Sequence, residues 1–274
     1  GGPSTGLPTK TEQSDLLQAL YGRNGESPCI VIAASSPANC FNYAFEAARL
    51  SLEHMTPVIL LTDGYLANGS ELWKIPSMKD MPVIKPPKVA DNTEGYKPYE
   101  RDPERLNRFW AVPGQPGLRH RVGGLEKADV TGEVSHDPMN HQVMVELREK
   151  KVQKVVEFIP DQEVVGPAEA DLLVVGWGGT YGALVSAVND LHEEGKSVAL
   201  AQFNYINPLP GNTARLFSGY KKILVCELNL GQFASHLRSK HPQFEYLQYN
   251  KVQGLPLFIS ELKIKINEVL ESIK

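Results

Sequence analysis

The sequence is poor in cysteine, and the three it has, Cys29, Cys40 and Cys226, lie far apart. An odd, scattered set does not build a disulfide framework and favours a reducing compartment, so we expect a cytoplasmic protein. A [4Fe–4S] cluster normally takes four thiolates, commonly at close spacing. The three cysteines therefore cannot hold such a cluster, and Cys29 and Cys226, inside apolar runs, are expected to be buried small hydrophobes.

Long apolar runs and an excess of one charge are also missing. No apolar run reaches the ~18 residues that a membrane-spanning helix requires, so we expect no membrane contact. The net charge of −4, without a basic run, gives no reason to expect nucleic acid. Gly1 to Gln13 lacks the apolar centre of a signal peptide. With 42% hydrophobic and 22% charged residues over 274 positions, the composition fits a globular protein with room for two domains.

What is present begins with the stretch GGPSTGLPTKTEQSDL. Gly1 to Gly6 contains three glycines, one proline and two hydroxyl residues, typical of a loop whose backbone approaches something closely. Thr9 or Thr11 can cap a helix that continues through the leucines at 16–20. Such a loop and helix start can hold a phosphate or carboxylate on free N–H groups. A tight structural connection would show the same composition.

Short apolar runs then alternate with helical patterns. The runs at 29–34 and 57–61 read as strands buried on both faces, with a helix from Pro37 to about His54 between them. This alternation indicates a layered α/β domain. Because two strands are too few for such a domain, we expect its remaining strands in sequence upstream of Gly1. Ser70 to Trp73 predicts one more short helix.

The pattern dissolves from Ile75 to Pro116, where eight prolines fall. Proline at this density prevents regular elements, and so long a loop indicates an interdomain and intersubunit arm or a plain linker. Asp137-Pro138 then predicts a helix that runs to about Phe158. His136 and His141 flank its start. A metal site there would need a third ligand that the sequence does not reveal, so solvated or capping histidines are the simpler interpretation.

A second α/β unit begins at Ala170. The runs at 171–175, 198–202 and 223–226 predict strands, 244–249 predicts a short edge strand, and 183–194 and 256–273 predict helices. The turn GWGGTYG after the first of these strands does not match the G-x-G-x-x-G pattern of dinucleotide-binding folds. We therefore do not predict a nucleotide site at this turn.

The string GGPSTGLPTKTEQSDLLQALYGRNGE resembles a loop and helix in the α subunit of 2-oxoacid:ferredoxin oxidoreductases, in particular the 2-oxoglutarate branch. The turns GWGGTYG and ELNLGQ, and their spacing, are similar to the last domain of the same subunits. The resemblance implies an α/β fold with a partial thiamine-diphosphate pyrimidine-type domain and a transketolase C-terminal-like domain. The implied division is 1–75, a proline-rich arm with a connecting helix at 76–168, and 169–274.

The resemblance also implies a reaction. The family decarboxylates a 2-oxoacid oxidatively with coenzyme A as co-substrate, which gives acyl-CoA, carbon dioxide and reduced ferredoxin. Thiamine diphosphate and an iron–sulfur cluster are held mainly by a cluster-bearing β subunit, in a dimer of heterodimers or a larger assembly. An arginine and an activating glutamate of the family lie upstream of the glycines and are absent from this sequence. We therefore expect the C-terminal portion of a subunit that alone binds no cofactor and has no activity.

The resemblance places the substrate side of the site in the first ten residues. Its predicted substrate-binding residues are Gly2, Ser4, Thr5, Gly6, Thr9 and Lys10, with Gln13 just behind them. Lys10 is equally consistent with a solvated surface cation, and a ligand contact of Asn229 or Gln232 is conceivable. No catalytic base can be named. A pyruvate or branched-chain oxidoreductase, a transketolase-like enzyme or dehydrogenase β subunit, and a non-catalytic scaffold module remain alternatives.

Overall fold

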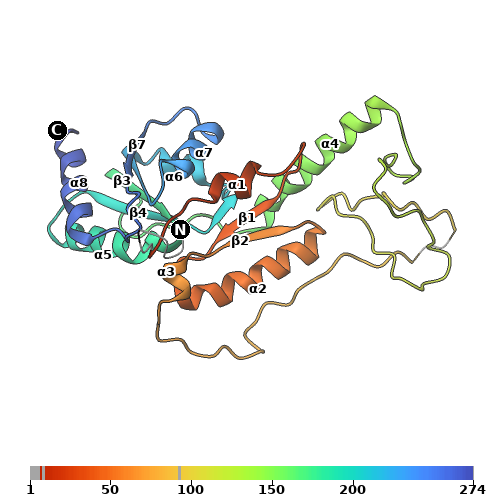
Figure 1. The fold of residues 1–274 in the computed structure, drawn as a ribbon, viewed down its shortest axis with the longest axis horizontal. Helices are drawn as coiled ribbons and strands as arrows, with labels where there is room; N and C mark the ends of the chain where they lie inside the picture. The colour runs from red at the N-terminus through yellow and green to blue at the C-terminus, as the bar shows by residue number, and fades with distance from the viewer. Residues whose placement is uncertain (1–6, 8–9, 92–93, 274) are drawn as a thin grey trace.

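The computed structural model describes residues 7, 10–91 and 94–273 (Figure 1). The first part of the chain alternates helices with short strands. Its elements are α1 (Leu16–Tyr21), β1 (Ile30–Ala33), α2 (Pro37–His54), β2 (Val58–Leu61) and α3 (Gly64–Ala67). The helix α2 begins where the Ser36 hydroxyl accepts the Asn39 N–H at 3.3 Å and Pro37 fills the first turn. The predicted strands at 29–34 and 57–61 and the helix between them are confirmed. Burial on both faces holds for β1 but not for β2, which is only partly buried because it is an edge strand of the described sheet.

The rest of the regular structure follows residue 137. Its elements are α4 (Pro138–Gln153), η1 (Lys154–Phe158), β3 (Ala170–Trp177), η2 (Gly178–Thr180), α5 (Tyr181–Glu193), β4 (Val198–Phe203), β5 (Tyr205–Asn207), α6 (Thr213–Phe217), β6 (Tyr220–Glu227), α7 (Gln232–Lys240), β7 (Tyr246–Asn250) and α8 (Ile259–Glu271). The strands and helices predicted for this region are present, and β7 is an edge strand as predicted. The predicted helix from Asp137 to Phe158 is α-helical to Gln153 and then tightens into the 3₁₀ turn η1.

Two sheets organise the described chain. The larger is all-parallel in the order β4-β3-β6-β7, and the smaller has the order β2-β1-β5. In the smaller sheet β1 and β2 are parallel, while β5 runs antiparallel to β1. One further strand of this sheet, β5, thus comes from the C-terminal part of this chain, which the sequence did not reveal. The strands expected upstream of Gly1 stay a prediction.

The hydrophobic core is continuous between the two sheets. One buried cluster combines Leu16 of α1 and Val31 of β1 with Leu173 of β3 and Phe233 of α7. A second cluster covers the opposite face of the four-stranded sheet with α5 and α8. The parallel sheet is therefore enclosed by helices on both faces, which is the expected solution for buried parallel strands.

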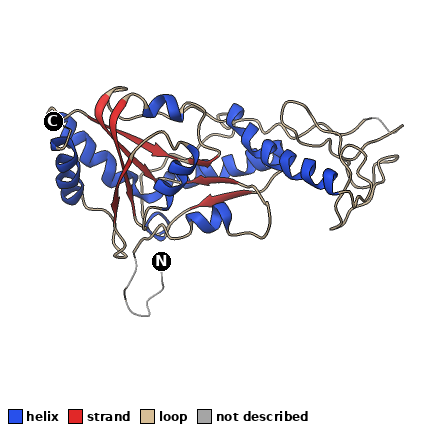
Figure 2. Ribbon diagram, turned by 90° about the horizontal axis from the view of Figure 1, so that it is seen from above, coloured by secondary structure: helices blue, strands red, loops and turns tan. Residues whose placement is uncertain are grey.

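Between α3 and α4, residues 68–137 form a long arm. Its described residues contain no helix or strand, only isolated bridges such as Val89 with Trp110 and Tyr99 with Val130. Figure 2 shows much of it as loops beyond the end of α4. The irregular structure predicted for 76–116 is confirmed, and the proline density explains it because proline lacks the N–H that a ladder needs.

Two helix predictions are wrong. The first helix starts at Leu16 after Asp15, not at Thr9 or Thr11, because backbone N–H groups before it are used elsewhere: Lys10 donates to the Gly254 carbonyl at 2.7 Å. The residues 70–73 are not helical; a single turn, α3, forms earlier, where Asp63 accepts two N–H groups. Among the described residues, no helix combines the length and apolar character needed to cross a bilayer.

Candidate functional site

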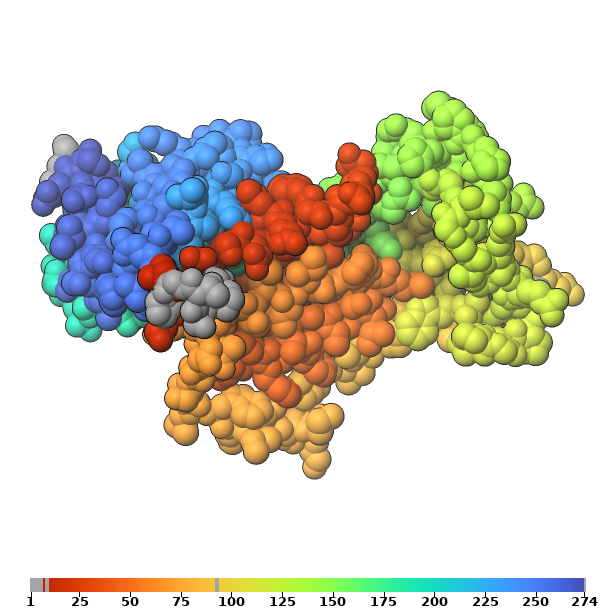
Figure 3. Space-filling model, viewed as in Figure 1, coloured from red at the N-terminus to blue at the C-terminus, as the bar shows by residue number. Residues whose placement is uncertain are grey.

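The N-terminal segment 10–15 crosses the carboxyl ends of strands from both sheets. We call this place the junction; it consists of residues 10–15, 34, 61–63, 177–179 and 227–229. In Figure 3 the red N-terminal segment lies in the seam between the blue C-terminal part and the orange α2 region. In open α/β sheets, ligands bind outside the carboxyl ends of the strands. The junction is therefore the first place to look for a site.

Gln13 is the residue that locks the segment in place. Its side chain donates to the Trp177 carbonyl at 2.7 Å and accepts the Leu228 N–H at 2.9 Å. Its backbone N–H donates to the Leu228 carbonyl at 3.2 Å, and its carbonyl accepts the Asn229 side chain at 2.9 Å. Because Gln13 is 4% exposed, these four hydrogen bonds are shielded from water. They fix the segment 10–15 against the ends of β3 and β6.

Glu227, the last residue of β6, is a completely buried carboxylate. It accepts hydrogen bonds from Trp177 Nε1 at 3.1 Å, Asn229 Nδ2 at 3.0 Å, and the backbone N–H groups of Phe233 at 2.8 Å and Ala234 at 3.0 Å. The last two lie in the first turn of α7, where the helix dipole stabilises a negative charge. Glu227 therefore connects β3, β6 and α7 by hydrogen bonds. It also accepts a hydrogen bond from Asn229, which in turn donates to Gln13.

Asp63 connects the smaller sheet to the glycine turn after β3. One carboxylate oxygen caps α3, and the other accepts the Gly179 N–H at 3.1 Å. A Cβ on Gly179 would lie 2.1 Å from that oxygen, so only glycine allows the approach. At Gly176 a Cβ would meet Leu184 at 2.2 Å. Gly176 and Gly179 of GWGGTYG are thus required for packing, whereas a Cβ on Gly182 would meet nothing within 4 Å.

A small cavity of about 40 Å³ opens at the junction. Its walls include the carboxylates of Glu12, Asp15 and Asp63, together with Ala34 and Trp177. The Thr11 hydroxyl nearby in the chain is buried and has no hydrogen-bond partner among the described residues. In the described part of the junction, acidic side chains therefore line the cavity and a hydroxyl group lies close to it in the chain, on a segment fixed by buried hydrogen bonds.

The structure describes only some of the predicted site residues. Gly2, Ser4, Thr5, Gly6 and Thr9 lie outside the described residues. Lys10 is exposed, at the start of the anchored segment. Gln13 bonds to residues at the ends of β3 and β6, and it lines the junction cavity together with Ala34 and Leu61 from the smaller sheet's strand ends. Asn229 and Gln232 are occupied by internal contacts, because Gln232 donates to the Ser14 carbonyl at 2.9 Å and accepts the Leu17 N–H at 3.0 Å.

The buried histidines and cysteines do not line the junction cavity. Burial lowers the pKa of His54 and of His236 to about 4 each, so both rings are neutral. His236 lies near Tyr21 and the Ile206 carbonyl, at 3.3 and 3.0 Å from its two ring nitrogens. Cys29 and Cys226 are buried as predicted, and burial raises both thiol pKa values. Among the described residues, no group of three or more potential ligands is placed to hold a metal ion.

Sequence reasoning missed Asp63, Trp177 and Glu227 as parts of the junction. Each ends or closely follows a run that the sequence identifies as a buried strand. Polar residues at the carboxyl ends of parallel strands meet at one edge of the sheet. This signal was sufficient to nominate the two carboxylates, although it does not reveal that Asn229 bonds to both Glu227 and Gln13.

The comparisons with known proteins agree with one another. Residues 1–139 match the family described as pyruvate flavodoxin/ferredoxin oxidoreductase, thiamine diP-binding. The 2-oxoglutarate oxidoreductase subunit KorA of Mycobacterium tuberculosis is 49% identical over 96% of this chain and 40% of its own length. The 2-oxoacid:ferredoxin oxidoreductase 2 subunit alpha of Aeropyrum pernix is 32% identical over 99% of this chain and 43% of its own length.

A solved structure resembles the whole described chain. The 2-oxoglutarate:ferredoxin oxidoreductase from Magnetococcus marinus, with 2-oxoglutarate, coenzyme A and succinyl-CoA bound, aligns with 98% of this chain at a TM-score of 0.87 and 32% identity. The alignment covers 47% of that protein's chain. This chain thus spans less than half the length of each of these three relatives.

Proposed function

The chain belongs to the pyruvate flavodoxin/ferredoxin oxidoreductase family, and from this premise we propose that it is part of the α subunit of a 2-oxoglutarate:ferredoxin oxidoreductase. The enzyme would decarboxylate 2-oxoglutarate oxidatively with coenzyme A, giving succinyl-CoA, carbon dioxide and reduced ferredoxin. The observation that carries the proposal is the 49% identity to a 2-oxoglutarate oxidoreductase subunit over 96% of the chain. The related solved structure was determined with 2-oxoglutarate and coenzyme A bound, which supports the same substrates.

Thiamine diphosphate, when bound, supplies the carbon nucleophile and the electron sink of this chemistry. The described junction residues do not fit that cofactor by themselves, because the cavity there is about 40 Å³ and ligand pockets are usually several hundred Å³. We therefore propose that the cofactor and the iron–sulfur cluster are held mainly by a β subunit. In this arrangement the present chain supplies one wall of the site, and the enzyme works in the cytoplasm.

The wall that we propose is the loop before the junction. Gly2, Ser4, Thr5, Gly6 and Thr9 would face the oxoacid carboxylate or coenzyme A, with Lys10 beside them. Gln13 supports this role because its four hydrogen bonds anchor the end of the loop against β3 and β6. A loop anchored in this way loses little further entropy when it orders around a ligand.

The arm is proposed as a contact with another subunit. Leu72, Ile75, Met78 and Val83 expose most of their side chains on it. Apolar side chains in such numbers mark interaction surfaces. We propose a β subunit in a dimer of heterodimers or a larger assembly, with domains divided at about residues 75 and 168.

The proposed function is tested by measuring which 2-oxoacid and which electron acceptor the enzyme prefers. The purified complex, containing the full α subunit and its partner, should turn over 2-oxoglutarate faster than pyruvate or branched-chain 2-oxoacids, with ferredoxin and not NAD as acceptor. A preference for pyruvate or NAD would instead support one of the related thiamine enzymes. If the chain does not co-purify with a cluster-bearing subunit, a scaffold role becomes the better explanation. The isolated chain should have no decarboxylase activity.

The loop is tested by Thr5→Val in the complete complex, with Thr131→Val in the arm as the matched control. Loss of a hydrogen bond to a charged ligand should lower kcat/KM for 2-oxoglutarate or coenzyme A about tenfold. Subunit assembly, measured by size-exclusion chromatography, should be unchanged. Wild-type kinetics in the Thr5 variant would assign the loop a structural role only.

A further inference from the structure

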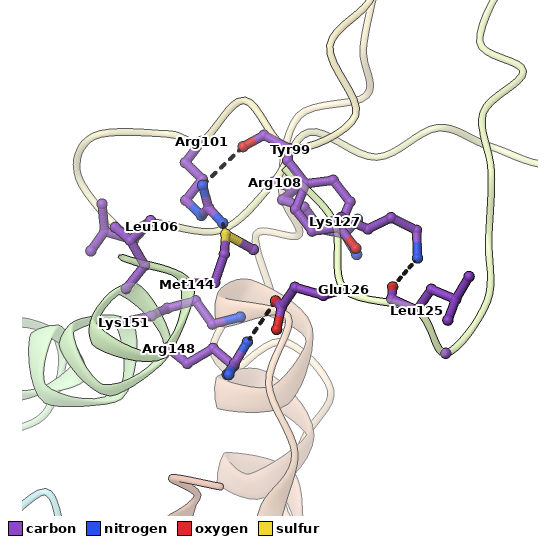
Figure 4. Close-up of a pocket in the computed structure, with 12 residues that line it drawn as sticks. Tyr99, Arg101, Leu106, Arg108, Leu125, Glu126, Lys127, Met144, Arg148 and Lys151 are labelled. Carbon is purple, nitrogen blue, oxygen red and sulfur yellow. Dashed lines mark hydrogen bonds and ion pairs between the residues drawn. The ribbon is translucent and has the colours of Figure 1, made fainter. Parts of the chain in front are cut away.

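A cavity of about 370 Å³ lies where the arm packs on α4, away from the junction. Its floor is one face of α4, since Met144, Leu147, Arg148 and Lys151 follow each other at helical spacing. The opposite walls come from the arm and include Tyr99, Arg101, Arg108 and residues 124–127. Figure 4 shows these side chains around the opening. The volume is within the range of small-molecule sites.

Positive charge dominates the lining. Five cationic side chains, Arg101, Arg108, Lys127, Arg148 and Lys151, surround a single lining carboxylate, Glu126. Lys127 is used internally, because its ammonium donates to the carbonyls of Gly123 and Leu125. Of the other four cations, Arg101 pairs with Asp129, and Arg148 lies near Glu126. The cavity therefore keeps an excess of positive charge.

Three of these cations, Arg108, Arg148 and Lys151, are weakly neutralised. Arg148 lies 3.8 Å from Glu126, beyond hydrogen-bond length, and that carboxylate also binds the His141 ring at 2.5 Å. Arg108 stacks on the Tyr99 ring at 4.6 Å and has no acidic partner among the described residues. Lys151 donates to the Met55 carbonyl at 2.9 Å, which offers a dipole and no counter-charge.

Crowding of these charges has an electrostatic cost. Burial, together with the neighbouring positive charges of Arg108 and Arg101, lowers the pKa of Lys151 to about 8. In Figure 4 the Lys151 ammonium and the Arg148 guanidinium point toward Glu126, with Arg101 beyond the Met144 sulfur. An anion placed among them would relieve their mutual repulsion.

We propose that this cavity binds a small phosphate-bearing molecule, whose phosphate is contacted by Arg108, Arg148 and Lys151. Guanidinium groups bind phosphate oxygens in pairs, and an ammonium adds a point charge, so the set suits a group that carries about two negative charges. The site is separate from the junction and does not depend on the proposed reaction.

The test is titration calorimetry of the assembled enzyme, saturated with thiamine diphosphate, using inorganic pyrophosphate as the probe. We expect one saturable site per α subunit. Arg108→Gln and Arg148→Gln should each weaken binding about tenfold, since each removes a charge-assisted contact. Lys150→Gln, an exposed position on the same helix, is the matched control and should bind as the wild type does.

Three outcomes would overturn the proposal. Pyrophosphate fails to bind the assembled enzyme, as it would if an acidic segment of a partner fills the cavity. Alternatively, Lys150→Gln weakens binding as much as the cavity variants do, which would indicate general surface charge. Finally, succinate binds as tightly as pyrophosphate, so that phosphate is not selected. Because Arg148 is 42% exposed at its side chain, its substitution leaves folding intact and keeps the test decisive.

Discussion

In the junction, amide, indole and backbone groups bond to one another and to the carboxylates of Glu227 and Asp63. In the arm, by contrast, the contacts join charged side chains to rings, carbonyls and acids near the surface. Gln13 and Glu227 are both almost inaccessible to water. In the arm, Arg105 lies 4.1 Å above the Phe158 ring, and Arg101 pairs with Asp129. The junction has the regular elements of two sheets behind it, while the arm has isolated bridges.

The difference predicts two kinds of stability. Hydrogen bonds shielded from water are costly to break, because the abandoned partner stays buried and unpaired. Ion pairs and cation–π contacts at partly exposed positions contribute little each and weaken with salt. The junction should therefore respond strongly to single substitutions and weakly to salt, and the arm should show the reverse.

The largest effect is expected at Glu227. Glu227→Ala removes the acceptor for four donors, on Trp177, Asn229, Phe233 and Ala234, and leaves them buried without a partner. We expect the free energy of unfolding to fall by about 3–5 kcal/mol. Urea unfolding of the intact protein, followed by circular dichroism, measures this loss.

Glu227→Gln is the matched control, because it keeps the side chain's shape and one acceptor oxygen. It should lose less than the alanine variant, with the difference unchanged between low and high salt. A loss below about 1 kcal/mol for Glu227→Ala would mean that water or repacking satisfies the four donors. The expectation that the junction responds more strongly to substitution than the arm would then be wrong.

A smaller, pH-dependent effect is expected at His236. Its pKa of about 4 in the folded protein lies below the ordinary value near 6.5, so the unfolded chain binds its proton first. The contribution of this residue to the free energy of unfolding is fully present above about pH 6.5 and is lost as the pH falls toward 4. The loss amounts to about 3 kcal/mol. His236→Gln should remove this part of the acid sensitivity, measured as the unfolding free energy at pH 7 and pH 4.

His192→Gln, at an exposed position of α5, serves as the comparison for His236. It should leave the pH dependence as it is in the wild type. If both variants flatten the curve equally, or neither does, then His236 is not held neutral by burial. The small ring cluster of His236 with Tyr21 and Phe233 would then tolerate a charge.

The sequence predicted the strands that end at the junction better than the long-range hydrogen bonds and strand pairings that connect them. Apolar runs such as 171–175 identify buried strands because burial on both faces leaves a local mark in the sequence. The strand β5 has only three residues and forms because β1 lies beside it, which no local pattern reveals. Likewise, the delayed start of α1 follows from the hydrogen bonds of 10–15 to residues more than 200 positions away.

The candidate site divides in the same way. The glycine turn and the segment around Gln13 were found from composition and resemblance, since both have unusual local sequences. The sequence identified Glu227 only as the start of a turn. Its role depends on hydrogen bonds from Trp177 and from the first turn of α7, and the folded sheet brings these groups together. The cationic cavity of the arm was missed entirely, since Arg108 and Lys151 belong to segments without a shared periodicity.

The smallest effect is expected in the arm, at Arg105. Arg105→Met keeps an apolar stem beside Phe158 and removes the charge that lies over its ring, so the loss should be about 1 kcal/mol or less. Hydrogen exchange of arm amides should accelerate in the variant at 50 mM salt, and the difference from the wild type should shrink at 500 mM salt as screening grows. Exchange at the Gln13 and Leu228 amides should stay constant in both conditions. If the Gln13 amide also accelerates, the arm and the junction open as one cooperative unit, and the two kinds of stability are not separable.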